Sequence, residues 1–145
     1  MLWDSENGPA SYDEINLVEP GFNSGWTQIM GPDARDSQNV SDLVQFPGSH
    51  YADPKFSWFN TVGPTAITFM SSPGLGADYT NDLFVGDINN GNLYRFRVNA
   101  ARNGFDLAPG SLDRRLSLTS TATGKRTEEF TVTGHGRLSD RRMEG

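Results

Sequence analysis

The chain has 145 residues and a formal net charge of −6 at neutral pH, and its apolar content of 35% is low for a self-sufficient domain. It contains no cysteine, which excludes disulfide bonds and thiolate metal sites. It also lacks a run of about 20 apolar residues, so we expect neither a membrane span nor a secretory signal within it. Its basic residues are scattered without interleaved aromatic residues, so nucleic-acid binding is not expected.

Sixteen glycines and eight prolines separate short runs of strand-forming residues, which predicts an all-β protein with almost no helix. The predicted strands cover residues 14–18, 65–70, 83–87 and 92–98, and two weaker strands are marked by Leu116 and Leu118 and by Phe130 and Val132, around a turn at 123–125. Residues 31–57 contain clusters of turn-forming residues and are predicted to be a long loop. Asn90-Gly91, between two predicted strands, suits the positive φ of a hairpin.

The first 31 residues crowd turns and acidic residues around the predicted strand at 14–18. Residues 6–16 follow the pattern Glu-x-Gly-Pro-x-x-x-Asp-Glu-Ile-Asn, and residues 21–26 follow Gly-x-Asn-x-Gly-Trp. A plain strand and turn need fewer special residues, so this stretch is predicted to hold a ligand. These motifs, together with residues 63–69, 82–96 and Gly-Arg-Leu-Ser-Asp at 136–140, resemble the glucose/sorbosone dehydrogenase family of soluble, pyrroloquinoline-quinone (PQQ) dependent aldose dehydrogenases. Thr27 stands where that family usually has proline.

The resemblance implies a six-bladed β-propeller whose blades have four antiparallel strands. A blade of this kind needs about 40–50 residues, so the chain would supply two to three blades. Both ends of the chain are expected to cut through repeats, which makes residues 1–145 a partial propeller domain, incomplete at both ends. An open set of blades exposes apolar faces and unpaired edges, so we expect the remaining blades to be partners of this chain.

The resemblance also implies two calcium sites. The backbone carbonyls of Gly8 and Pro9 would help to hold the Ca²⁺ that polarises PQQ. Glu14 would bind a second, structural Ca²⁺ together with the backbone carbonyl of Ser24. Calcium prefers oxygen ligands of this kind. The residues alone also fit a plain tight turn at Gly8 and a solvated acidic strand end at Glu14.

By resemblance, four residues belong to the PQQ site: Asn7, Thr61, Asn89 and Arg137. Phe56 lies near the position of an aromatic residue that lines the same cavity, although Phe56 and Thr61 also fit a core aromatic and a strand-start threonine. The family has a lysine at the position of Asn89 and a second arginine at that of Ser139. PQQ carries three carboxylates, and charged donors bind carboxylates about twice as strongly as neutral ones. The loss of two cations out of three therefore predicts weak PQQ binding.

As a function, the resemblance implies an oxidoreductase that acts on the anomeric hydroxyl of an aldose and is periplasmic or secreted. The histidine base of the family lies upstream of this chain, so no catalytic residue is expected here and the chain alone is predicted to be inactive. His50 and His135 are expected at the surface and at a cavity rim. The alternative is a non-catalytic, calcium-stabilised propeller that binds a carbohydrate or a protein, which Asn89 and Ser139 favour.

Overall fold

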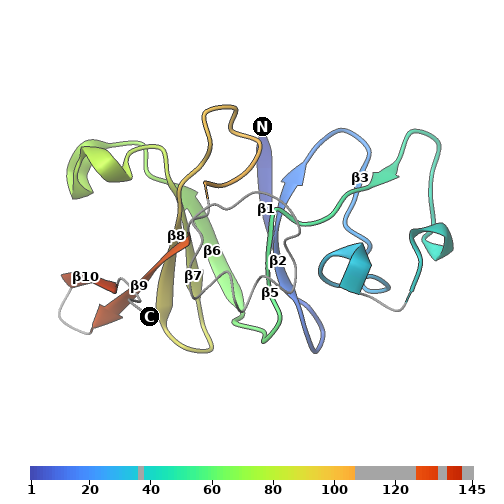
Figure 1. The fold of residues 1–145 in the computed structure, drawn as a ribbon, viewed down its shortest axis with the longest axis horizontal. Helices are drawn as coiled ribbons and strands as arrows, with labels where there is room; N and C mark the ends of the chain where they lie inside the picture. The colour runs from blue at the N-terminus through green and yellow to red at the C-terminus, as the bar shows by residue number, and fades with distance from the viewer. Residues whose placement is uncertain (36–37, 107–126, 134–136, 142–145) are drawn as a thin grey trace. The chain divides into compact units, whose positions relative to one another are not determined.

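The computed structural model describes residues 1–35, 38–106, 127–133 and 137–141 (Figure 1). Within them the chain is built from short strands, and helix is limited to four 3₁₀ segments of three residues each. The prediction of an all-β protein with almost no helix is therefore confirmed. The chain divides into two compact units, Met1–Gly63 and Pro64–Gly145. No helix among the described residues is long and apolar enough to cross a membrane.

The first unit contains a three-stranded antiparallel sheet with strand order β1-β2-β5. Its strands are β1 (Leu2–Glu6), β2 (Asp13–Val18) and β5 (Phe56–Trp58). Short elements interrupt the long connection between β2 and β5: β3 (Phe22–Asn23) pairs in parallel with β4 (His50–Tyr51), and η1 (Asp33–Arg35) and η2 (Val40–Asp42) lie between them in sequence. The prediction of a long loop at 31–57 is wrong at its end, because Phe56 and Ser57 belong to β5, which pairs with β2. Outside these strands and 3₁₀ segments, the described part of the loop is irregular.

Strand β2 forms the centre of this unit. Ile15 is fully buried and lies opposite Phe56 on β5, while Leu17 lies opposite Trp3 on β1. Because β2 is covered on both faces, its first two residues, Asp13 and Glu14, are also buried, at 1% and 0% exposure. The sequence thus places two acidic side chains inside the unit, and the fold must supply partners for both.

The second unit contains one antiparallel sheet with strand order β10-β9-β8-β7-β6. Its elements are β6 (Pro64–Phe69), η3 (Pro73–Leu75), η4 (Ala77–Tyr79), β7 (Leu83–Asp87), β8 (Asn92–Phe96), β9 (Thr127–Thr133) and β10 (Arg137–Arg141). The strands predicted at 65–70, 83–87 and 92–98 are confirmed to within two residues. The predicted hairpin is present as well, since Asp87 Oδ1 accepts hydrogen bonds from the N–H groups of Asn90 and Gly91, and Gly91 has φ of 71°.

The described sheets have three, five and two strands, whereas four strands were expected in each blade. In the first unit, an irregular segment follows β5, and its Val62 and Gly63 donate their N–H groups to Asp13. In the second unit, the hairpin of β9 and β10 extends the sheet. Phe130 and Val132 lie on β9 as predicted, but the predicted strand at 116–118 and the turn at 123–125 lie outside the described residues.

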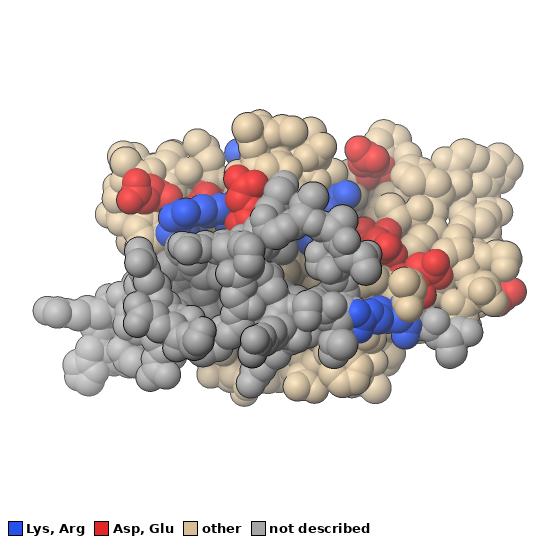
Figure 2. Space-filling view, in the orientation of Figure 1, with Lys and Arg blue, Asp and Glu red and all other residues tan. Residues whose placement is uncertain are grey.

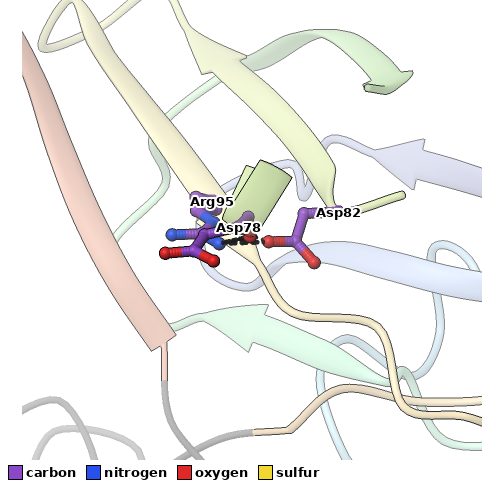
Figure 3. A network of polar contacts seen from close by, with 3 residues as sticks. All are labelled: Asp78, Asp82 and Arg95. Atoms are coloured by element: carbon purple, nitrogen blue, oxygen red, sulfur yellow. Dashed lines mark hydrogen bonds and ion pairs between the residues drawn. The ribbon is translucent and has the colours of Figure 1, made fainter. Parts of the chain in front are cut away.

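A buried ion pair fixes the segment before β7 to the second sheet (Figure 3). Arg95 of β8 is 2% exposed, and its Nε and Nη2 atoms both lie 2.6 Å from Oδ2 of Asp82. The same guanidinium donates to the backbone carbonyl of Asp78 and stacks 4.0 Å from the ring centroid of Tyr79. The guanidinium of Arg95 is thus paired, hydrogen-bonded and stacked within the second unit.

Figure 2 shows the charged side chains on one face. The described Lys and Arg side chains seen there lie beside Asp and Glu side chains.

We predict that Asp82→Asn lowers the free energy of unfolding of the full-length protein by about 3–5 kcal/mol, because it leaves the Arg95 charge buried without its partner. Asp78→Asn is the matched control, since Asp78 contacts Arg95 through its backbone carbonyl. The measurement is denaturant unfolding of both variants and the wild type. Equal stability of the two variants would contradict the prediction.

Candidate functional site

Asp13 and Glu14 open β2 with their side chains on opposite faces, because successive side chains of a strand alternate. Asp13 accepts hydrogen bonds from Gly8 and from the Val62–Gly63 segment, whereas Glu14 accepts them from Gly31 and Asn16. The two neighbouring acids therefore organise two different places in the first unit. One holds the Gly8–Pro9 turn, and the other is an enclosed acidic site.

Glu14 is the centre of the enclosed site. Its Oε1 accepts the N–H of Gly31 at 2.6 Å, and its Oε2 accepts the side-chain amide of Asn16 at 3.3 Å. Burial raises the pKa of Glu14 to about 7, in spite of these two hydrogen bonds, and the charges of Glu6 and Asp53 raise it further. No Lys, Arg or His among the described residues forms an ion pair with it. The site therefore holds a carboxyl group whose charge is uncompensated.

Glu6 brings a second carboxyl group to the same site. It lies directly opposite Glu14 in the pairing of β1 with β2, and its Oε2 accepts a hydrogen bond from the hydroxyl of Ser24 at 2.9 Å. Burial raises the pKa of Glu6 as well. Two oxygen atoms here are buried without a hydrogen-bond partner, Oε1 of Glu6 and Oδ1 of Asn16. Buried acceptors without partners are rare and call for a bound ion or water.

The chemistry of these groups fits Ca²⁺, which takes carboxylate, amide and carbonyl oxygens as ligands. No cluster of three or more His, Cys, Asp or Glu side chains able to hold a metal is found among the described residues. An ion bound by Glu14 would therefore need oxygen atoms of other kinds. Asn16 and the backbone near Ser24 can supply them, since the Ser24 hydroxyl already contacts Glu6.

Two segments expected at the cofactor site, 7–9 and 61–63, meet at the side chain of Asp13. Asn7 is exposed, and its backbone carbonyl accepts the indole N–H of Trp26 at 3.2 Å. Gly8 follows, and its N–H is held by Asp13. Asp13 also binds Val62 and Gly63, which follow Thr61 directly, so the structure brings the Asn7–Pro9 and Thr61–Gly63 segments to one carboxylate.

Asn89 lies in the second unit, exposed at the tip of the hairpin between β7 and β8. Burial would raise the pKa of the neighbouring Asp87, but hydrogen bonds from Tyr94, Asn90 and Gly91 lower it below the ordinary value. The hairpin is thus closed by an ionised carboxylate. The side chains of Arg137 and Ser139 lie outside what the structure describes, and so does His135.

Two further residues can be placed. Phe56 is 6% exposed and packs edge-on against Trp58, with ring centroids 4.7 Å apart, which fits the interpretation as a core aromatic. His50 is exposed on β4, as expected for a surface residue.

The sequence interpretation missed the part that Glu6, Asn16 and Gly31 play around Glu14. The spacing of Glu14 and Asn16 was the available signal, since residues two apart share one face of a strand.

Comparison with known proteins assigns the chain to a family. The family model described as Glucose / Sorbosone dehydrogenase matches residues 1–120. This chain belongs to the glucose/sorbosone dehydrogenase family. No curated protein matches the chain.

Two solved structures show the same fold. They are described as "Crystal structure of glucose dehydrogenase" and "glucose dehydrogenase", and each gives a TM-score of 0.52 with 23% identity over 71% of this chain. The matches cover 29% and 28% of those proteins, so this chain spans less than a third of their length. The fold of this member of the glucose/sorbosone dehydrogenase family is a fragment of a β-propeller.

We predict that Glu14 makes the metal-free protein less stable as the pH rises from 4.5 to 7. The folded state holds the Glu14 proton more tightly than the unfolded chain does, so it binds more protons in this window, and stability falls as they leave. The shift corresponds to a loss on the order of 3 kcal/mol. Thermal unfolding in a chelator at several pH values measures it.

Glu14→Gln is the matched variant, because it keeps the shape of the side chain and cannot ionise. It should flatten the pH dependence between pH 4.5 and 7 and reduce the stabilisation that added Ca²⁺ gives to the wild type. An identical pH profile and calcium response in wild type and variant would mean that Glu14 is neither the titrating group nor a calcium ligand.

Proposed function

We propose that the full-length protein is a PQQ- and Ca²⁺-dependent sugar dehydrogenase that oxidises the anomeric hydroxyl of an aldose. The observation that carries the proposal is membership of the glucose/sorbosone dehydrogenase family over residues 1–120. The site of Glu14 supports the calcium dependence, because its buried carboxyl group lies beside two buried oxygen atoms that have no hydrogen-bond partner, Oε1 of Glu6 and Oδ1 of Asn16. This chain would supply part of the cofactor wall and the calcium-binding residues.

In this proposal the first unit holds both ions. The backbone carbonyls of Gly8 and Pro9 bind the Ca²⁺ next to the cofactor, on the turn whose N–H is fixed by Asp13. Glu14 and the backbone carbonyl of Ser24 bind the structural Ca²⁺, and the unpaired oxygen atoms of Glu6 and Asn16 add to its ligands. When bound, PQQ supplies the electron acceptor for the sugar and Ca²⁺ polarises its quinone oxygen.

By resemblance to the family, the cofactor itself would be bound by Asn7, Thr61, Asn89 and Arg137. Asn7 and Thr61 offer neutral donors and acceptors from the first unit, and Asn89 offers an amide from the hairpin of the second. Arg137 would supply the one cation of the set. Binding of PQQ is therefore proposed to be weak. The residues would hold and orient the cofactor, while the base that removes the hydroxyl proton belongs to the rest of the protein, which we propose to be periplasmic or secreted.

The second candidate is a non-catalytic, calcium-stabilised propeller that binds a carbohydrate or a protein. The neutral, exposed Asn89 at the hairpin tip favours it, because a lysine there would pair with a cofactor carboxylate. The enclosed site of Glu14 is compatible with either function. The two candidates differ in PQQ binding and in sugar oxidation.

We predict that the full-length protein reduces a dye in the presence of an aldose, PQQ and Ca²⁺, whereas the isolated 145-residue chain does not. General base catalysis contributes about 10²–10⁴-fold, and the remaining blades supply the base and most of the pocket. Dye reduction at saturating PQQ checks both forms. Activity of the isolated chain would contradict the placement of the base, and a full-length protein inactive with every aldose tested would favour the binding protein.

We also predict that Asn89→Lys combined with Ser139→Arg tightens PQQ binding to the full-length protein. Each new charged hydrogen bond contributes about 1.5–3 kcal/mol, which is roughly one to two decades in affinity. The measurement is a PQQ titration with Ca²⁺ present. Nanomolar binding by the wild type, or no gain in the double variant, would show that these positions do not face the cofactor. Ile88→Lys, at an exposed position of the same hairpin, controls for added charge.

A further inference from the structure

A single buried carboxylate joins two distant parts of the first unit. Asp13 is 1% exposed, and its Oδ1 accepts the N–H of Gly8 at 2.9 Å. Its Oδ2 accepts the N–H groups of Val62 at 2.6 Å and of Gly63 at 2.7 Å. The two segments are held by the two oxygen atoms of one planar group, so their separation is set by the carboxylate itself.

The geometry around this carboxylate leaves little freedom. A Cβ atom on Gly8 would lie 2.1 Å from the carbonyl oxygen of Ser11 and 2.4 Å from that of Tyr12, so the turn packs backbone directly on backbone. Gly63 adopts φ of 66°, a conformation that glycine accepts without strain. The turn and the Val62–Gly63 segment are therefore shaped to present their N–H groups to Asp13.

The register of the sheet does not require this arrangement. Asp13 lies opposite Trp58 in the pairing of β2 with β5, and the N–H of Tyr12 donates to the carbonyl of Phe59 at 3.1 Å. These backbone contacts already hold the strands together. The side chain of Asp13 adds a link between the two loops that leave the sheet, and charged acceptors make such links about twice as strong as neutral ones.

We propose that Asp13 is a positioning residue of the cofactor site, which sets the distance between the carbonyls of the Gly8–Pro9 turn and the side chain of Thr61. The inference rests on the proposed function, which gives the turn a calcium ion and Thr61 a contact with PQQ. Asp13 touches neither group and acts through the backbone that it holds.

The test compares Asp13→Asn with the wild type in the full-length protein. Asparagine has one acceptor oxygen and an N–H₂ group, so it cannot accept from both segments, and its N–H₂ would face a backbone N–H. Loss of an outer-shell residue that orients the ligands of a metal ion typically costs 10–100-fold in metal affinity or activity. We therefore expect PQQ, titrated with Ca²⁺ present, to bind Asp13→Asn about 10–100-fold more weakly.

Hydrogen exchange of the amides gives a second measurement that does not depend on the cofactor. Without PQQ, exchange in Asp13→Asn should become faster in the 7–9 and 61–63 segments together. Asp82→Asn is the matched control, because it also removes a buried carboxylate charge but lies in the second unit. It should lower the melting temperature without weakening PQQ binding by the folded protein.

The outcomes separate this inference from the proposed function. If the wild type does not bind PQQ, the proposed function fails, and hydrogen exchange alone decides whether Asp13 links the two segments. If the wild type binds PQQ and Asp13→Asn binds it equally well, or if Asp82→Asn weakens binding as much, the positioning role is wrong.

Should Asp13→Asn fail to fold, Asp13→Glu keeps both acceptor oxygens one methylene further out. It should fold and bind PQQ more weakly than the wild type, and unchanged binding would overturn the inference.

Discussion

Two successive acidic residues at the start of one buried strand organise the first unit. Asp13 and Glu14 point to opposite faces of β2, and neither has a basic partner among the described residues. A buried carboxylate without hydrogen bonds costs several kcal/mol, so each must recruit donors or a cation. Asp13 meets this demand with three backbone N–H groups. Glu14 has only one backbone N–H and one amide, so in the absence of a cation its carboxyl group keeps its proton up to about pH 7.

The sequence was sufficient for β2, β6, β7 and β8 and for the family, but not for β1 and β5. Strands at 83–87 and 92–98 follow from apolar residues bounded by turn residues, and the Asn90-Gly91 turn follows from its local chemistry. These features depend on neighbours in sequence, which is why local patterns predict them. The Gly-Pro and Asp-Glu motif likewise predicts the correct family, and the family match over residues 1–120 confirms it.

The sites could be predicted only in part, because their partners come from distant positions. The N–H of Gly31 reaches Glu14 across 17 residues, and that of Val62 reaches Asp13 across 49. No local sequence pattern predicts either of these two hydrogen bonds. The strand count shows the same limit, since four strands were expected in each blade and the described sheet around β2 has three. The role of Glu6 follows from the register of β1 against β2, which a sequence does not state.

The two carboxylates bear differently on the choice between an enzyme and a binding protein. A propeller that needs calcium only for stability would keep the Glu14 site, since an ion that binds the folded state stabilises it whatever the protein does. The Asp13 link is of another kind. It fixes a turn whose packing admits only glycine at position 8, and it fixes it against the segment that carries Thr61. Its three backbone hydrogen bonds stabilise the first unit whichever function the protein has. Under the proposed function the same link would also preorganise the turn and Thr61 for a cofactor, so cofactor binding, and not stability, is the property by which Asp13 distinguishes the two candidates.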